Sequence, residues 1–426
     1  MNVPNETGII YLRDLPKDKI YVDLNKNFKL YILNKAKDIS GNWINLGKDL
    51  NLEISKKGKC KTLECIKENK RFRIGTLLKI IDFLKDNKIW INEKIICDNI
   101  EVLSTRHNKG PNKLTNSIYK PRLPIDFNTE YGGTLVAAFL GDGGIDKDLK
   151  PNYNNNEIIL KRKVYESFCS VFGFVSGKAR NFNNQQIYFP KVAGIILTEC
   201  LGMKSGRKTQ TNPKVPDFLL NGSSKVKSSF LQHLYDDEGT VYFKKNDSQR
   251  EIVIKFANRI TEDVINHKAI QETNDEKYAP NLIKDTKSMI EGFGIKATKL
   301  ECVEIYKTKV GDYNTKWTFH IRKKHNLYLF MSNINFHLKR KREKLLRAYN
   351  SFHDFEKIKA ERIENILLGC REIELNQEGI TSRSLALKFN KSQSWSKIII
   401  RNLRKTNYLL LKKPKHGIIG AQYILA

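Results

Sequence analysis

Two acidic residues, each at the end of an apolar run and each followed by glycine, are the residues in this sequence best suited to metal-assisted chemistry. Residues 135–143 read Leu-Val-Ala-Ala-Phe-Leu-Gly-Asp-Gly, and residues 231–239 read Leu-Gln-His-Leu-Tyr-Asp-Asp-Glu-Gly. The acids, Asp142 and Glu238, are 96 positions apart, which indicates an internal duplication. Carboxylates are good Mg²⁺ ligands, and metal ions near the attacking water and the leaving oxygen promote phosphodiester hydrolysis. One such segment alone would be typical of an ordinary helix end. The interpretation as a metal site therefore depends on the repeat and on the segments that flank it.

Basic residues flank the second acidic segment. Lys214 begins the stretch Lys-Val-Pro-Asp-Phe-Leu-Leu just before it, and Lys341 lies in the basic run Lys-Arg-Lys-Arg-Glu-Lys-Leu at 339–345. A lysine beside a scissile phosphate offsets developing negative charge or tunes the attacking water, so both are candidate catalytic residues. The alternative for Lys341 is a position on the solvated face of a basic helix.

The charge balance points to a polyanionic partner. The chain has 426 residues, 76 Lys and Arg against 46 Asp and Glu, and a formal net charge of +30. Hydrophobic residues make up 40%, which is enough for folded domains, and the length suggests about three of them. Nucleic acid is the commonest partner of such a chain, although general lysine richness would give the same excess.

The sequence also excludes several classes of protein. It has no apolar run long enough for a membrane helix, its start lacks the regions of a signal peptide, and its seven cysteines are scattered and odd in number. We therefore expect an intracellular protein with reduced thiols, no zinc site and no membrane partner.

The pattern divides the chain into a first block, a central block and a last block. Residues 1–125 end in a loop-like stretch at 107–112 followed by Pro121 and Pro124. Within this block, Asn42 is suited to cap a helix, and Ile74, Leu77, Leu78, Ile81 and Leu84 follow a helical period. This predicts a small helical domain, either a DNA-binding helix-turn-helix or a plain helical cap on the centre.

The last block, 353–426, predicts three helices and a hairpin. The helices fall at about 355–369, from Thr381-Ser382 onward, and at about 393–405, and the hairpin turns at Pro-Lys-His-Gly 414–417. This order resembles a winged helix, whose third helix would present Lys397, Arg401 and Arg404 to DNA. A winged helix used for dimerisation is the alternative.

Strand-like segments of the central block alternate polar and apolar residues. Residues 315–322 place Trp317, Phe319 and Ile321 on one face and basic or polar residues on the other. Such a polar face can lie along the major groove, although it is also typical of an ordinary solvated sheet. The candidate DNA-binding residues of the central block are Lys178, Arg180, Gln185, Gln186, Arg250, Lys255, Lys307, Lys309, Lys316, Thr318, His320, Arg322, Lys339 and Arg340.

The two acidic segments with their flanking lysine elements resemble the LAGLIDADG homing endonucleases, particularly the dodecapeptide subtype of inteins and free-standing archaeal enzymes. The resemblance covers about 220 residues. It implies an α+β fold of two pseudo-symmetric halves, 126–222 and 223–350, each of αββαββα order with a saddle-shaped antiparallel sheet. It further implies Mg²⁺ (or Mn²⁺) held at Asp142, Gly141, Glu238 and Asp237, a long double-stranded DNA target and a catalytically complete monomer.

The second segment departs from the family pattern at two positions. His233 and Asp237 stand where the family usually has small residues, and we expect His233 to be a side chain of the helix interface and Asp236 to be structural. Since the chain begins with Met1 and shows no splicing blocks, we expect a free-standing protein and not an intein. Two alternatives remain open: a non-cutting DNA-binding regulator that keeps the LAGLIDADG fold, and an RNA-binding intron maturase.

Overall fold

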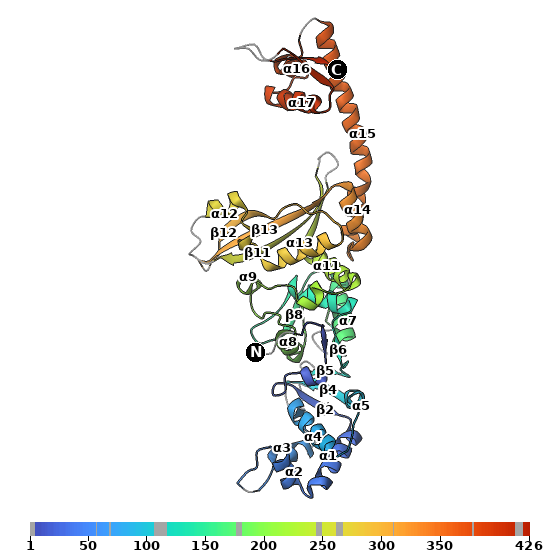
Figure 1. Cartoon of the computed structure of the whole chain (residues 1–426), viewed down its shortest axis with the longest axis vertical. Coiled ribbons are helices and arrows are strands. Elements are labelled where there is room, and N and C mark those ends of the chain that lie inside the picture. Colours follow the sequence, from blue (N-terminus) through green and yellow to red (C-terminus); the bar gives the residue numbers. More distant parts are fainter. Residues whose placement is uncertain are drawn as a thin grey trace. The chain divides into compact units, whose positions relative to one another are not determined.

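The computed structural model describes residues 5–56, 58–67, 70–105, 117–175, 181–243, 249–260, 267–309, 311–376, 379–413 and 421–426. The chain divides into two compact units, Met1–Tyr349 and Asn350–Ala426. Both mix helices with small antiparallel sheets, so the predicted α+β class is confirmed (Figure 1). Among the described residues, no helix combines the length and the apolarity that a membrane span requires.

The first block is not purely helical, which corrects the sequence prediction. A four-stranded antiparallel sheet of order β3-β2-β4-β5 lies among its helices, and β1 pairs separately with β6. The elements are β1 (Ile9–Ile10), β2 (Tyr21–Leu24), α1 (Lys26–Ser40), α2 (Trp43–Asp49), α3 (Lys61–Lys67), β3 (Phe72–Arg73), α4 (Ile74–Asp86), α5 (Glu93–Asp98), β4 (Ile100–Ser104), β5 (Ser117–Tyr119) and β6 (Ile125–Asp126). Strands of two to five residues are too short to show a period of two.

The helices of this block form for the expected reasons. The side chain of Asn42 accepts hydrogen bonds from the N–H groups of Ile44 and Asn45 and so caps α2. The five residues that follow the helical period in α4 are all buried, with Ile74, Leu77 and Leu84 at no exposure. The predicted linker at 107–112 lies outside the described residues.

The next segment surrounds a helix that is buried along most of its length. This helix, α6 (Glu130–Leu140), buries every residue from Gly132 to Leu140. A three-stranded antiparallel sheet follows, in the order β7-β8-β9. The elements after α6 are β7 (Gly143–Ile145), β8 (Pro151–Asn154), α7 (Ile158–Phe172), β9 (Gln186–Tyr188), α8 (Lys191–Glu199), α9 (Lys208–Thr211) and α10 (Asp217–Leu220).

A second long helix, α11 (Ser224–Glu238), opens the following segment, which contains a four-stranded antiparallel sheet of order β10-β11-β13-β12. Its elements are β10 (Gly239–Phe243), β11 (Arg250–Ile260), α12 (His267–Thr273), α13 (Asn281–Gly292), β12 (Glu301–Lys307), β13 (Tyr313–Arg322) and α14 (Lys324–Asn333). The predicted apolar face is confirmed, because Trp317, Phe319 and Ile321 are fully buried.

The helix α15 (Lys339–Leu375) runs through the boundary between the units. The second unit continues with α16 (Ser382–Lys388), α17 (Gln393–Lys405) and the antiparallel strands β14 (Leu409–Lys413) and β15 (Gln422–Leu425). Thr381 and Ser392 cap α16 and α17, and both helices begin close to the predicted positions. The core gathers Cys370, Ile373, Ile380, Leu385, Ile400, Leu403 and Leu409. The predicted turn at 414–417 lies outside the described residues.

Candidate active site

The helices α6 and α11 pack side by side and end at the candidate acids. Their backbones come so close that a Cβ added to Gly133 would stand 2.5 Å from the carbonyl oxygen of Val226. Thr129 caps the start of α6, and Ser223 caps the start of α11. Small residues at the contact therefore allow an approach that brings the two helix ends together.

The carboxyl groups of Asp142 and Glu238 share one partly buried neighbourhood. Asp142 follows α6 by two residues, and Glu238 is the last residue of α11. Burial raises the pKa of each carboxyl, and the charge of Asp142 raises the pKa of Glu238 further. The ammonium of Lys208 opposes both shifts, so the two acids interact electrostatically with the same buried cation.

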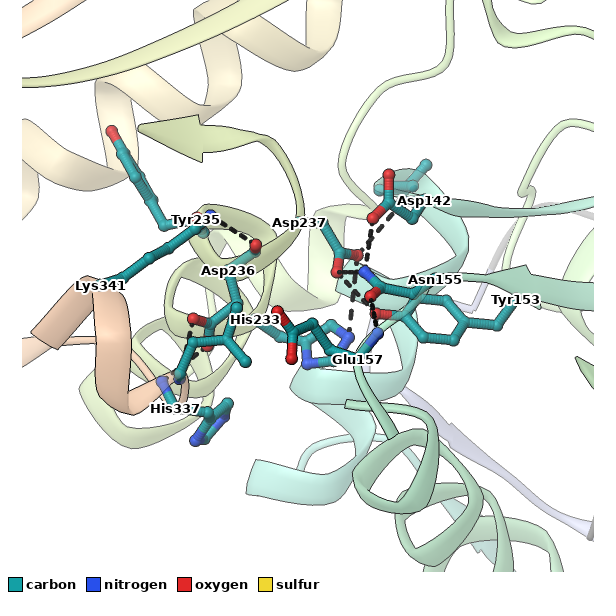
Figure 2. Close-up of polar contacts among 12 residues, drawn as sticks. Asp142, Tyr153, Asn155, Glu157, His233, Tyr235, Asp236, Asp237, His337 and Lys341 are labelled. Carbon is teal, nitrogen blue, oxygen red and sulfur yellow. Dashed lines mark hydrogen bonds and ion pairs between the residues drawn. The ribbon is translucent and has the colours of Figure 1, made fainter. Parts of the chain in front are cut away.

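A third acid, Asp237, fills the space between the two helix ends. Figure 2 shows its carboxylate turned toward Asp142, Tyr153 and Asn155. Its Oδ1 accepts a hydrogen bond of 2.6 Å from the Tyr153 hydroxyl, and its Oδ2 accepts one of 3.2 Å from the Asp142 backbone N–H. The side chain has no exposure, and burial raises its pKa well above the ordinary value.

Asn155 fixes the other side of this cluster. Its Oδ1 accepts the backbone N–H of Glu157 at 2.8 Å, which orients the amide so that its NH₂ group faces the acids (Figure 2). That NH₂ donates to Asp142 Oδ2 at 2.7 Å and lies 3.4 Å from Asp237 Oδ1. Nothing in the sequence pattern indicated Asn155 or Tyr153, because their role depends on where β8 ends relative to α6.

Two buried lysines hold equivalent places at the two helix ends. Lys208 Nζ donates to Leu140 O at 3.1 Å, and Lys341 Nζ donates to Asp236 O at 2.6 Å; each carbonyl stands two residues before its acid. Lys341 also donates to Tyr235 O and Gly239 O, as Figure 2 shows in part. Burial lowers the pKa of both ammonium groups, and nearby carboxylates counteract the shift.

Lys214, the candidate from the sequence, lies elsewhere. Its ammonium is 62% exposed and pairs with Asp217 at 3.0 Å. Lys208, six residues earlier, takes the position expected for Lys214 beside the acids. No local pattern indicates Lys208, because α9 is a helix of only four residues with no apolar period.

The donor set suits a hard divalent cation that keeps water or phosphate ligands. The described residues contain no group of three or more His, Cys, Asp or Glu side chains arranged around a metal position. Two carboxylates, Asp142 and Glu238, are what Mg²⁺ typically takes from a protein when phosphate oxygens complete its shell. Asp237 fits such a shell poorly, because Tyr153 and the Asp142 N–H already use both of its oxygens. Gly141, next to Asp142, has no room for a side chain.

His233 and Asp236 occupy structural positions. His233 is fully buried in the helix interface, its ring 5.7 Å from Tyr153 and 6.2 Å from His337. Burial lowers its pKa to about 3, so its 3.8 Å approach to Asp237 is that of a neutral ring and not an ion pair. Asp236 accepts the backbone N–H groups of His337 and Leu338, just ahead of α15.

The candidate DNA-binding residues in and beside the four-stranded sheet separate into exposed lysines and side chains close to a carboxylate. Lys255, Lys307 and Lys309 are exposed. Lys316 pairs with Glu304 at 3.4 Å, while His320 and Arg322 both approach Glu251. The exposed lysines are therefore the cations of this sheet most open to a polyanion.

Two of the candidates are buried, which corrects the sequence prediction for them. Thr318 is 1% exposed and donates to Ile254 O at 2.9 Å. Arg250 is 6% exposed, with its guanidinium 5.8 Å from the Phe243 ring. Period-two alternation assigned Thr318 to the polar face, and Arg250 was expected to join that surface, but both side chains are buried.

The remaining candidates are distributed over several elements. Gln185 is exposed, whereas Gln186 donates to Asn152 Oδ1 at 2.9 Å. Lys339 is largely exposed, and Arg340 pairs with Glu157 at 3.0 Å. In the second unit, the candidates Lys397, Arg401 and Arg404 are all exposed along α17. Lys178 and Arg180 lie outside the described residues.

Comparison with known proteins gives weak likenesses. No protein-family model matches the chain. Two proteins named tRNA-splicing ligase RtcB are similar, from Pyrococcus abyssi (25% identity over 175 residues) and Methanopyrus kandleri (26% over 196 residues). These matches span 40% and 44% of this chain but only 17% and 18% of the ligases. Among solved structures, the N-terminal LAGLIDADG domain of DUF199/WhiA aligns with 12% identity and a TM-score of 0.26, over 53% of this chain and 90% of that domain.

Proposed function

We propose that the chain is a metal-dependent, site-specific double-strand DNA endonuclease of the LAGLIDADG homing type. The observation that carries the proposal is the cluster at the ends of α6 and α11. There, one acid from each duplicated segment, Asp142 and Glu238, interacts with the same buried ammonium of Lys208. Carboxylates held together in partial burial favour a bound divalent cation, because its charge offsets the cost of keeping both of them ionised.

The order of elements supports two related halves. Each long helix is followed by two antiparallel strands, then a helix, and then further strand structure: α6-β7-β8-α7-β9 in one segment and α11-β10-β11-α12 onward in the other. In the second unit, two capped helices followed by the β14-β15 hairpin support a winged helix with α17 as the reading helix.

The chain's own residues have separable roles in this mechanism. When bound, Mg²⁺ or Mn²⁺ supplies Lewis-acid stabilisation of the phosphate and a more acidic attacking water. Asp142 and Glu238 would hold the metal, so that one acid from each segment gives two matched centres, one for each DNA strand. Lys208 and Lys341 fix the two helix ends through the carbonyl groups they bind, and they place positive charge close to the acids.

The exposed cations would hold the duplex. Lys255 and Lys307 on the four-stranded sheet, Lys309 just after β12, and the basic residues of α17 are exposed. They are open to phosphate, and the net charge of +30 favours association with it. Since both acids stand in one chain, we expect the active form to be a monomer. A species of about twice 49.4 kDa as the only active form would contradict that expectation.

The names of the two archaeal relatives refer to tRNA splicing, but we do not propose that activity for this chain. The match covers less than a fifth of either ligase, so most of what makes up those proteins has no counterpart in it. Duplex DNA is therefore the proposed substrate, and structured RNA is tested in parallel.

The decisive experiment incubates the purified full chain with Mg²⁺ and a randomised duplex DNA library, followed by sequencing of the ends. Asp142→Asn and Glu238→Gln are the matched variants, because each keeps the size of its side chain and removes the negative charge. Defined ends with the wild type that are lost in both variants are the expected result. Exposed Asp148→Asn, in the turn after β7, is the control that should still cut.

The other outcomes separate the alternatives. Tight, sequence-selective DNA binding without cleavage, unchanged in both variants, would replace the proposal with a DNA-binding regulator. Preference for a structured RNA library over duplex DNA, measured in parallel at the same salt concentration, would favour the intron maturase.

A further inference from the structure

The two helix ends are not equivalent, and the difference is Asp237. One residue before each acid, the first segment has Gly141 and the second has Asp237. These two residues face each other: a Cβ built on Gly141 would stand 2.5 Å from Asp237 Oδ2 and 3.0 Å from Asp237 Cβ. The side chain of the second segment therefore occupies the space that glycine leaves free in the first.

The Asp237 side chain holds the loop that carries Asp142 in place through hydrogen bonds. Its Oδ2 accepts the Asp142 N–H, and its Oδ1 accepts the Tyr153 hydroxyl. Asn155 then holds the Asp142 carboxylate directly at 2.7 Å. The backbone and the carboxylate of Asp142 are thus both fixed by hydrogen bonds before any ligand binds.

Glu238 has no comparable support. No described residue donates a hydrogen bond to its carboxylate, and its side chain is one methylene longer than that of Asp142. The Lys341 ammonium binds carbonyl groups around Glu238, so the backbone there is held, while the carboxylate interacts with the charge of Lys208 and accepts no hydrogen bond like the one that Asn155 gives Asp142. A group already in its productive geometry reacts faster than one that must be ordered first.

We propose that Asp237 is a positioning residue for Asp142, and that it makes one centre preorganised and the other adjustable, so that the two DNA strands are cut at different rates. This inference rests on the proposed nuclease function and extends it. Asp237 itself touches neither metal nor DNA in this scheme. Its effect reaches the reaction through the Asp142 N–H and through Tyr153.

The test measures both strands separately on the duplex recovered from the library, labelled with a different dye at each 5′ end. For the wild type we expect unequal single-turnover rates and a transient nicked species. In Asp237→Ala, the faster strand should slow by about 10–100-fold, as is usual when a supporting hydrogen-bond partner is removed. The slower strand should change by less than about twofold, so that the two rates converge.

Two further variants keep the test informative if Asp237→Ala folds poorly. Asp237→Asn preserves the volume and an acceptor oxygen and should restore the strand preference in large part. Tyr153→Phe removes only the 2.6 Å hydrogen bond and should slow the same strand by a smaller factor. Exposed Asp148→Ala, a carboxylate deletion in the same half, should leave both rates unchanged.

The possible failures are distinguishable. Equal strand rates in the wild type, or an equal loss on both strands in Asp237→Ala, would overturn the positioning role while leaving the nuclease intact. An absence of cleavage by the wild type with either Mg²⁺ or Mn²⁺ would overturn the proposed function and the inference with it.

Discussion

Replacing Lys208 or Lys214 by methionine tests which lysine acts at the active centre. The structure places Lys208 there, whereas the sequence pattern suggested Lys214. Lys208 is buried beside both acids, and its ammonium donates to Leu140 O at 3.1 Å. Lys214 is mostly exposed and pairs with an exposed partner, Asp217. Methionine preserves the unbranched stem of lysine and removes the charge, so packing changes little in either variant.

The expected effects differ by more than an order of magnitude. Loss of a positioned, desolvated charge at a reacting centre typically costs about 10²–10³ in rate, or roughly 3–4 kcal/mol. Loss of an exposed ion pair is worth about 0.2–1 kcal/mol, which is a factor of about five at most. Lys208→Met should therefore nearly abolish cleavage, while Lys214→Met should stay within about fivefold of the wild type.

The assay is single-turnover cleavage of the selected duplex at saturating protein, with melting temperatures measured on the same samples. Saturation removes differences in DNA affinity, and the melting temperatures identify any loss of rate that reflects unfolding. If Lys214→Met were as slow as Lys208→Met, or if Lys208→Met cut normally while folded, the assignment of Lys208 to the active centre would be wrong.

Three other predictions test the helix interface, its buried histidine and the second unit. Gly133→Ala should destabilise the protein by about 1–3 kcal/mol in denaturant unfolding, because its Cβ would strike the backbone of the facing helix, whereas Gly144→Ala, which meets open space, should stay within about 0.5 kcal/mol. The His233 ring has a pKa of about 3 in the folded protein and about 6.5 in the unfolded chain. Between these pH values only the unfolded state binds the proton. The free energy of unfolding therefore falls as pH falls, by up to about 1.4 kcal/mol per pH unit. His233→Leu should flatten that slope, and an unchanged pH profile would contradict the burial of a neutral ring. Arg401→Ala should lower DNA affinity and reduce the salt dependence of log K by about 0.9, while Lys388→Ala, whose ammonium already pairs with Glu372, should leave that slope in place.

Sequence patterns predicted what depends on local periodicity. The burial of α4 follows directly from its apolar spacing, and Asn42 marks the start of α2 because its side chain satisfies otherwise unpaired N–H groups. Asp142 and Glu238 were chosen as candidates because the same pattern occurs twice, and the structure places them at the ends of the two packed helices. These features are encoded within about fifteen residues each.

What the sequence missed depends on contacts between distant segments. Lys208 reaches Leu140 across 68 positions, and Tyr153 reaches Asp237 across 84. Thr318 has the alternation of an outward residue, yet the tertiary packing buries it. The strands β3 and β5 are too short for any period and exist because β2 and β4 offer them hydrogen bonds. Such pairings are properties of the assembled core and leave no local pattern.

The facing pair of Gly141 and Asp237 also bears on why the two acidic segments share one chain. In a symmetric dimer of a single segment, equivalent residues would face each other, giving either two glycines or two aspartates at this contact. Two glycines would leave the Asp142 N–H and the Tyr153 hydroxyl without their acceptor, and two buried aspartates would repel each other at a distance where both cannot stay ionised. A chain with two non-identical segments avoids both the unpaired donors and the repulsion between carboxylates. Gly141 of one segment leaves space for the Asp237 carboxylate of the other. Restoring symmetry with Asp237→Gly should therefore weaken the hold on Asp142, even though it makes the second segment resemble the first.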